Sequence, residues 1–163
     1  MTHPTLKPDA HIRVELLSNP TYTSGMKDLV HAVAKRLGFA ELDCGHIALA
    51  VDEALCNIMT HGYEQRMDQP IWLSLWPLDP DGGKPGIKIV IEDRAKQIEP
   101  EKIRGRELQD VKPGGLGVHV IREVMDEVVY EKRDGGGMRL TMIKHSPAHC
   151  AGGPVVGGKG CHG

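Results

Sequence analysis

Hydrophobic and polar residues alternate over residues 11–18, where Ile12, Val14 and Leu16 recur at every second position. This period is typical of a half-buried strand. The apolar stretches 70–78 and 86–93 are also predicted to be strands, and the Pro- and Gly-rich segment between them predicts a hairpin loop. Residues 127–133 and 138–144 predict a final pair of strands joined by a glycine-rich turn.

Helical spacing of apolar residues predicts three helices between these strands. The first ends at Gly38, and the second begins with Asp43 as its N-cap and ends near Gly62. The third spans 116–128. Apolar stripes support the first helix (Met26, Leu29, Val30, Val33, Leu37), the second (Val51, Ala54, Leu55, Ile58, Met59) and the third (Val118, Ile121, Val124, Met125).

The remaining segments are polar or rich in glycine. Residues 94–115 predict one short helical turn after Pro100 and then a mobile segment. Residues 1–10 are read as an N-terminal extension, 11–144 as one domain and 145–163 as a flexible tail. The order of elements predicts an α+β fold: a two-layer sandwich of a mostly antiparallel, mixed sheet with helices on one face.

Composition narrows the class of protein. The 163 residues favour a single domain, and 4% aromatic residues predict an aliphatic core in which Met fills gaps. A net charge of −2 without a Lys/Arg block argues against nucleic-acid binding, and no apolar run is long enough to span a bilayer. Residues 1–11 lack the apolar core of a signal peptide. Cys44 and Cys56 would lie about 18 Å apart on one helix, too far to bridge. Reduced thiols and a cytoplasmic protein are therefore expected.

Glu53 and Asn57 are polar residues inside the apolar pattern of the second helix. Their spacing places the two side chains side by side. The amide oxygen of Asn can ligate Mg²⁺, and a carboxylate one turn away can accept a proton near metal-bound phosphates. The alternative is a solvent-exposed pair at the edge of the helix.

Two further features complete a candidate site. Gly114, Gly115 and Gly117 precede or open the third helix, where backbone N–H groups can bind phosphate, and Lys112 could reach a terminal phosphate. Asp93 ends a buried strand and could accept a hydrogen bond from an exocyclic amine such as that of adenine. Taken singly, the glycines could be an ordinary flexible loop, and Asp93 could simply cap a turn.

In this order the three features resemble the GHKL (Bergerat-fold, histidine kinase-like) ATPase superfamily. The segments ALAVDEALCNIMTHGY (48–63) and GGLGVHVIREVMDEVVYE (114–131) are similar to the N-box and second glycine box of the anti-sigma-factor serine/threonine kinases. The resemblance covers residues 11–144. It implies ATP and Mg²⁺ as cofactors, an anti-anti-sigma antagonist as the phosphorylated partner, and a sigma factor as a second partner; a homodimer is compatible with it.

The resemblance also assigns roles to residues. It implies that Glu53 is the general base, Asn57 the Mg²⁺ ligand and Asp93 the residue that reads adenine. Gly115 and Gly117, with the amides around them, match the phosphate loop, so that the nucleotide-binding set would also contain Lys112, Gly114, Leu116 and Val118. His61 matches a residue common at that position, although a histidine that simply ends a helix is an equal reading. Thr141 could line the adenine pocket.

The chain departs from the superfamily pattern at the first glycine box, Asp-x-Gly-x-Gly. Residues 93–97 read Asp-Arg-Ala-Lys-Gln, and Ala95 adds a methyl group where the backbone usually passes close to the base. The methyl group could be tolerated at about 1 kcal/mol, or it could mark a protein that has lost tight nucleotide binding. A non-catalytic regulator that binds other proteins is therefore a competing function.

A detached histidine-kinase catalytic domain and a zinc-binding tail are both less favoured. The detached domain would need a phosphoacceptor histidine motif, which is absent, and would usually carry Asn at position 53. The tail residues could in principle bind zinc, but their spacing fits no compact site, and a disordered tail is expected (His145, His149, Cys150, Cys161, His162).

Overall fold

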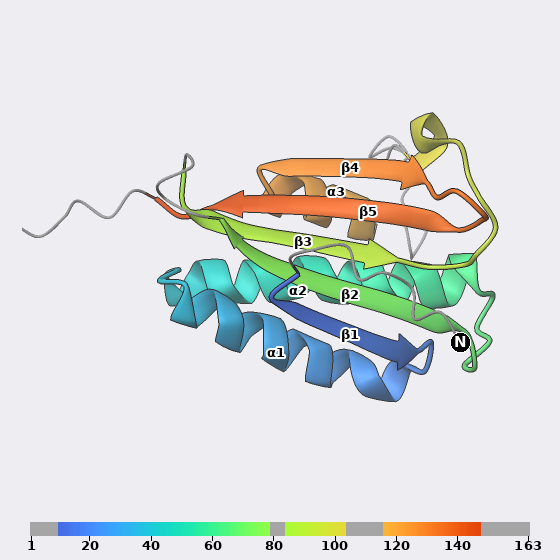
Figure 1. The fold of residues 1–163 in the computed structure, drawn as a ribbon, viewed down its shortest axis with the longest axis horizontal. Coiled ribbons are helices and arrows are strands. Elements are labelled where there is room, and N and C mark those ends of the chain that lie inside the picture. Colours follow the sequence, from blue (N-terminus) through green and yellow to red (C-terminus); the bar gives the residue numbers. More distant parts are fainter. Residues whose placement is uncertain (1–9, 79–83, 104–115, 148–163) are drawn as a thin grey trace, which may run out of the picture.

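The computed structural model describes residues 10–78, 84–103 and 116–147 as one sheet covered on one face by helices (Figure 1). The strands are β1 (Ile12–Leu17), β2 (Pro70–Leu78), β3 (Gly86–Glu92), β4 (Glu127–Lys132) and β5 (Met138–His145). The helices are α1 (Thr23–Arg36), α2 (Glu41–Asn57) and α3 (Leu116–Val124), with short helices η1 (Pro20–Tyr22), η2 (Ile58–Gly62) and η4 (Pro100–Ile103). The predicted α+β sandwich is confirmed.

The strands lie in the order β1-β2-β3-β5-β4, and each pair of neighbours is antiparallel. The expected mixed sheet is therefore entirely antiparallel within the described residues. Side chains alternate between the two faces of each strand. On β3, Ile87, Ile89 and Ile91 point at the helices, whereas Lys88, Val90 and Glu92 lie on the opposite face, which we call the outer face.

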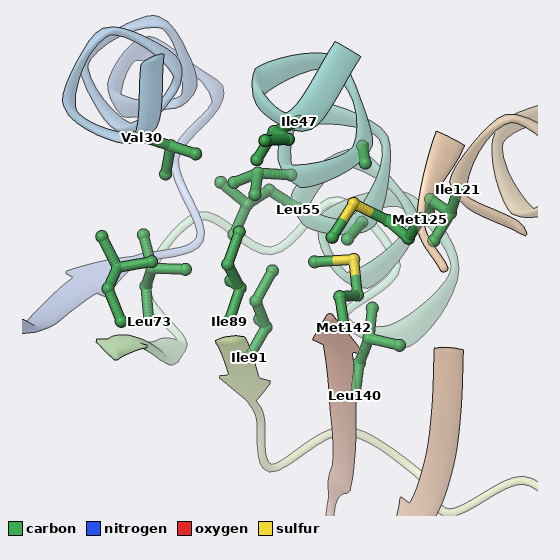
Figure 2. Close-up of a cluster of buried hydrophobic side chains, with 14 of the residues drawn as sticks. Val30, Ile47, Leu55, Leu73, Ile89, Ile91, Ile121, Met125, Leu140 and Met142 are labelled. Carbon is green, nitrogen blue, oxygen red and sulfur yellow. The ribbon is translucent and has the colours of Figure 1, made fainter. Parts of the chain in front are cut away.

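The core lies between the helices and the sheet, and Figure 2 shows its side chains converging from both layers. Val30 of α1, Ile47 and Leu55 of α2 and Ile121 of α3 are fully buried. Four methionines are also buried, which confirms the predicted aliphatic core with methionine as a filler (Met59, Met125, Met138, Met142). This packing holds α2 flat against the sheet.

The first helix ends at Gly38 as predicted. Gly38 has a φ of 89°, its amide donates to Lys35 O at 3.1 Å, and the amide of Phe39 donates to Ala34 O at 3.2 Å. These two bonds form a Schellman motif.

The predicted N-cap of the second helix is wrong. The helix α2 begins at Glu41, with Ala40 as N-cap, and Asp43 lies in its first turn. There the charge of Asp43 still favours the N-terminal end of the helix dipole.

The third helix is shorter than the predicted span 116–128, since α3 ends at Val124. The Asp126 amide already donates to Ile143 O at 2.9 Å, so the chain enters the sheet two residues after the helix. The predicted turn after Pro100 is confirmed as η4. The last strand continues through His145, the first residue of the predicted tail, while the segment predicted to be mobile lies mostly outside the described residues, as does the rest of the tail.

No helix in the described part of the chain is both long and apolar enough to cross a bilayer. Cys44 and Cys56 both lie on α2 as free thiols, the first buried and the second exposed. Across the described ranges, no three His, Cys, Asp or Glu side chains gather as a metal site. Four of the tail residues lie outside those ranges (His149, Cys150, Cys161, His162).

Candidate functional site

Glu53 and Asn57 lie half-buried on the last two turns of α2 and face the start of α3. A Cβ atom built on Gly117 would lie 2.5 Å from Glu53 Oε2 and 3.2 Å from Asn57 Nδ2. Only glycine can therefore pass this close to the two side chains as they are placed. We call these three residues the helix end of the site. The pair is not the fully exposed helix edge considered as an alternative.

The packing of α2 explains why these two side chains turn toward α3. Val51, Ala54 and Leu55 are almost completely buried against the sheet and α1, and they fix the rotation of the helix. The remaining face of this turn can therefore carry polar residues. After Asn57 the chain widens into a π-helical turn, in which the Tyr63 amide donates to Ile58 O at 2.8 Å. Turns of this kind are frequent at functional sites.

The π turn connects the helix end to the segment after β3. A Cβ atom built on Gly62 would lie 2.9 Å from Ala95 Cβ, so the methyl group of Ala95 packs directly onto the glycine. Ala95 is 8% exposed. The alanine that replaces a glycine of the superfamily pattern therefore occupies space left by another glycine. His61, on the same turn, is exposed to solvent.

Asp93 follows the core-facing series of β3, and its carboxylate points to the helical side of the sheet. Oδ1 accepts hydrogen bonds from the amides of Ala95 at 2.8 Å and Met138 at 3.1 Å. Among the described residues, the only fully buried side-chain polar atom without a partner is His145 Nδ1. The second carboxylate oxygen of Asp93 has no donor among the described residues, which provide both hydrogen bonds to Oδ1. We call Asp93, Ala95 and Met138 the strand end of the site.

Burial raises the pKa of Asp93 above its ordinary value. The hydrogen bonds from Ala95 and Met138 and the charge of Arg133 oppose this shift, but burial dominates. A buried carboxylate with one oxygen that receives no hydrogen bond from the described residues suits the recognition of a hydrogen-bond donor.

The structure does not bring every predicted residue to the site. Thr141 pairs with Val90 and Val129, between the core residues Leu140 and Met142, so it lies on the outer face. Thr141 therefore cannot line a nucleotide site between the sheet and the helices. The prediction is wrong because side chains alternate between the two faces of β5.

The other predicted residues lie at or before the start of α3. Leu116 opens α3, and Val118 is half-buried on its first turn. Lys112, Gly114 and Gly115 lie outside the described residues.

Sequence reasoning assigned no role to Tyr63, which the structure places between the two ends. Its side chain is fully buried, the hydroxyl donates to Pro70 O at 2.6 Å, and it accepts from the Arg94 amide at 2.7 Å. The phenol thus ties the turn after α2 to the segment after Asp93. A signal was present, because Tyr63 directly follows His61-Gly62 in a chain with few aromatic residues.

Comparison with known proteins identifies the class of protein that carries this arrangement. The profile of the histidine kinase-like ATPase domain matches residues 16–144, most of the chain. The chain therefore belongs to the histidine kinase-like ATPase domain family. A histidine kinase domain from Erythrobacter litoralis EL346 is similar with a TM-score of 0.46 and 16% identity, over 88% of this chain and 66% of that one.

Within this family the chain is similar to protein kinases that act on serine or threonine. The serine-protein kinase RsbW of Halalkalibacterium halodurans is 28% identical over 71% of this chain and 70% of its own length. The RsbW protein of Staphylococcus epidermidis is 26% identical over 83% and 86%. The serine/threonine-protein kinase BtrW of Bordetella bronchiseptica is 30% identical over 61% and 69%. The resemblance predicted from the sequence is confirmed.

Proposed function

We propose that this chain is an ATP-dependent serine/threonine protein kinase of the anti-sigma-factor type. The observation that carries the proposal is the contact of Glu53 and Asn57 with Gly117 at the start of α3. A carboxylate, an amide oxygen and a helix N-terminus meet there, and this donor set suits a magnesium-bound polyphosphate. The names of the relatives support the same class of reaction.

Each residue has a distinct task in this proposal. Glu53 accepts the proton of a serine or threonine hydroxyl on a protein substrate. Asn57 holds Mg²⁺ through its amide oxygen, and the first amides of α3 bind phosphate oxygens. Asp93 accepts a hydrogen bond from the exocyclic amine of adenine through its second carboxylate oxygen. Bound ATP supplies the transferable γ-phosphoryl group.

The regulatory part of the proposal follows from the family resemblance. The phosphorylated protein is an antagonist of the anti-anti-sigma type, and a sigma factor is the second partner of the same cytoplasmic chain. Phosphorylation of the antagonist lowers its affinity for the kinase and leaves the kinase free to bind the sigma factor. Transcription is thereby regulated by a switch of partners.

The competing function, a regulator with a degraded nucleotide site, depends on the missing glycines of residues 93–97. In the structure Ala95 is accommodated by Gly62, and the amides of Arg94 and Ala95 have partners. These contacts support a formed site. Calorimetry with Mg-ATP distinguishes the two functions, because a regulator with a degraded site should bind ATP with millimolar affinity or not at all.

The test is transfer of labelled phosphate from γ-labelled ATP to an anti-anti-sigma protein of the same organism. We expect Glu53→Ala to lower the transfer rate by about 100-fold or more while ATP still binds, because a general base typically contributes a factor of this order. Asp52→Asn is the matched control: this carboxylate precedes Glu53 on α2 but pairs with Lys27 of α1 at 3.5 Å. Full transfer by Glu53→Ala would remove the proposed base.

A further inference from the structure

Residues 93–97, which lack the glycines of the superfamily pattern, form hydrogen bonds to distant parts of the chain through both backbone and side-chain groups. The Gln97 amide group donates to Arg133 O at 2.7 Å and to Gly137 O at 3.1 Å. Both acceptors belong to the hairpin between β4 and β5. The backbone amide of Asp93 donates to Met138 O at 3.1 Å. The segment is therefore clamped to the hairpin along its length.

Arg133 contributes a second clamp from the same hairpin. Its guanidinium donates to the backbone carbonyl oxygen of Asp93 through Nη1. Nε lies 3.3 Å from Glu92 Oε1, and the guanidinium carbon lies 5.1 Å from the centre of the Trp72 ring. The side chain is 22% exposed. One half-buried guanidinium thus contacts a carbonyl oxygen, a carboxylate and an aromatic ring at the same time.

These contacts lie on the outer face of the sheet. Trp72 alternates with the core residues Ile71 and Leu73, and Glu92 follows the core residue Ile91. The carboxylate of Asp93 points to the helical side. Arg133 thus binds the carbonyl oxygen of Asp93 from the outer face, while the carboxylate lies on the helical side of the sheet.

We propose that Arg133 is a positioning residue for nucleotide binding: it fixes the Asp93 backbone, and so the carboxylate that reads the base. This inference rests on the proposed function. A charge-assisted hydrogen bond to a carbonyl is stronger than a neutral one, and the stacked ring limits the rotamers of the guanidinium. Without this bond, the peptide group between Asp93 and Arg94 keeps the hydrogen bond from the Arg94 amide to the Tyr63 hydroxyl but loses its anchor on the carbonyl side. The group can then tilt, and the Asp93 carboxylate shifts with it.

Arg139 offers a matched control. Its Nη2 lies 2.9 Å from the same Glu92 oxygen, also on the outer face, whereas the hydrogen bond to the Asp93 carbonyl oxygen comes from Arg133. Removing Arg139 therefore deletes a comparable ion pair and charge while the clamp on Asp93 stays. Comparing variants of the two arginines therefore distinguishes the positioning of Asp93 from a general effect of lost positive charge.

The experiment is calorimetry with Mg-ATP and with Mg-tripolyphosphate on the full chain. For Arg133→Met we expect ATP affinity to fall about 10-fold and tripolyphosphate affinity to stay within about 2-fold, because only ATP carries the base. Arg139→Met should leave both affinities within about 2-fold. Arg133→Lys, which keeps the charge but not the planar fork, should recover part of the ATP affinity. Hydrogen exchange of the Ala95 amide without ligand should accelerate in Arg133→Met only.

Equal ATP affinities of the two Met variants would overturn the inference, as would an equal loss of ATP and tripolyphosphate affinity in Arg133→Met. If the wild-type chain bound no ATP, the proposed function itself would fail and the inference with it, which is a different result. Should Arg133→Met not fold, Arg133→Lys decides: unchanged ATP affinity together with unchanged Ala95 exchange contradicts positioning.

Discussion

The polar side chains of the helix end lie one turn apart near the end of α2, whereas Asp93 is held by Ala95 nearby and by residues far along the chain. Glu53 and Asn57 meet Gly117 at the start of α3. At the strand end, the hydrogen bonds that hold Asp93 and Arg94 join residues 31 to 45 positions apart. Changes at the helix end can therefore abolish phosphate transfer while the protein stays folded. Changes at the strand end should lower the stability of the fold, because its long-range hydrogen bonds help to hold the fold together.

The largest effect is expected from Gly137→Ala, which breaks the strand end. Gly137 has a φ of 84°, and a Cβ atom there would lie 1.9 Å from the carbonyl oxygen of Asp93. Left-handed strain and overpacking against backbone together should lower the free energy of unfolding by about 4 kcal/mol. Urea denaturation measures this loss.

Gly135→Ala is the control for this prediction. Gly135 has the same φ of 84°, but a Cβ atom there meets nothing within 4 Å. Gly135→Ala should lower the free energy of unfolding only by the cost of a left-handed backbone, about 1–2 kcal/mol. Equal losses in the two variants would show that the contact with Asp93 is unimportant for stability.

The next largest effect is expected from Gly117→Ala, which should break the helix end without breaking the fold. The new methyl group would lie 2.5 Å from Glu53 Oε2, the tip of a flexible side chain that can swing away. Stability should therefore change by less than about 0.5 kcal/mol. Phosphate transfer should fall about 100-fold, equivalent to about 2.7 kcal/mol, because a proton acceptor displaced by about 1 Å loses its alignment.

Gly45→Ala on α2 is the control for the helix end, since a Cβ atom there has no neighbour within 4 Å. It should leave transfer unchanged and stabilise the helix by up to about 1 kcal/mol. A Gly117→Ala variant that unfolds, or that transfers phosphate at the wild-type rate, would contradict the proposed difference between the two ends.

The same difference explains what could be predicted from the sequence. The i, i+4 spacing of Glu53 and Asn57 is a local property of a helix, and the alternation of β3 placed Asp93 at the end of a buried strand. The contact of Gly62 with Ala95 and the clamp of Arg133 on Asp93 join segments more than 30 residues apart, and no local pattern encodes them.

The errors have similar causes. The role of Thr141 rests on similarity alone, and the two-residue period of β5 places this residue on the outer face. Asp is a favoured N-cap residue, yet the N-cap of α2 is Ala40, three residues before Asp43. The first helical residue, Glu41, pairs with His31 and Lys35 of α1. The local preference for an Asp N-cap therefore did not decide where the helix begins.

The smallest expected effect is the pH dependence of stability in Asp93→Asn, which separates the role of Asp93 in binding from its role in folding. Burial raises the pKa of Asp93, so the native state holds this proton more tightly than the unfolded chain. The contribution of Asp93 to wild-type stability is fully present below the ordinary pKa of 3.8 and is lost as the pH rises through the raised value. An Asn at this position keeps an oxygen acceptor for the Ala95 and Met138 amides but carries no charge.

Relative to the wild type, Asp93→Asn should therefore gain stability in urea denaturation as the pH rises above 3.8, while its ATP affinity falls. Asp126→Asn should show the opposite trend. Burial raises the pKa of Asp126, but hydrogen bonds from the His145 amide and the Lys144 ammonium outweigh burial and lower it overall. Parallel pH profiles for the two variants would contradict the assignment. A more stable but weakly binding Asp93→Asn chain would mean that the buried charge is retained for its ligand, because the hydrogen bonds of the strand end do not require it.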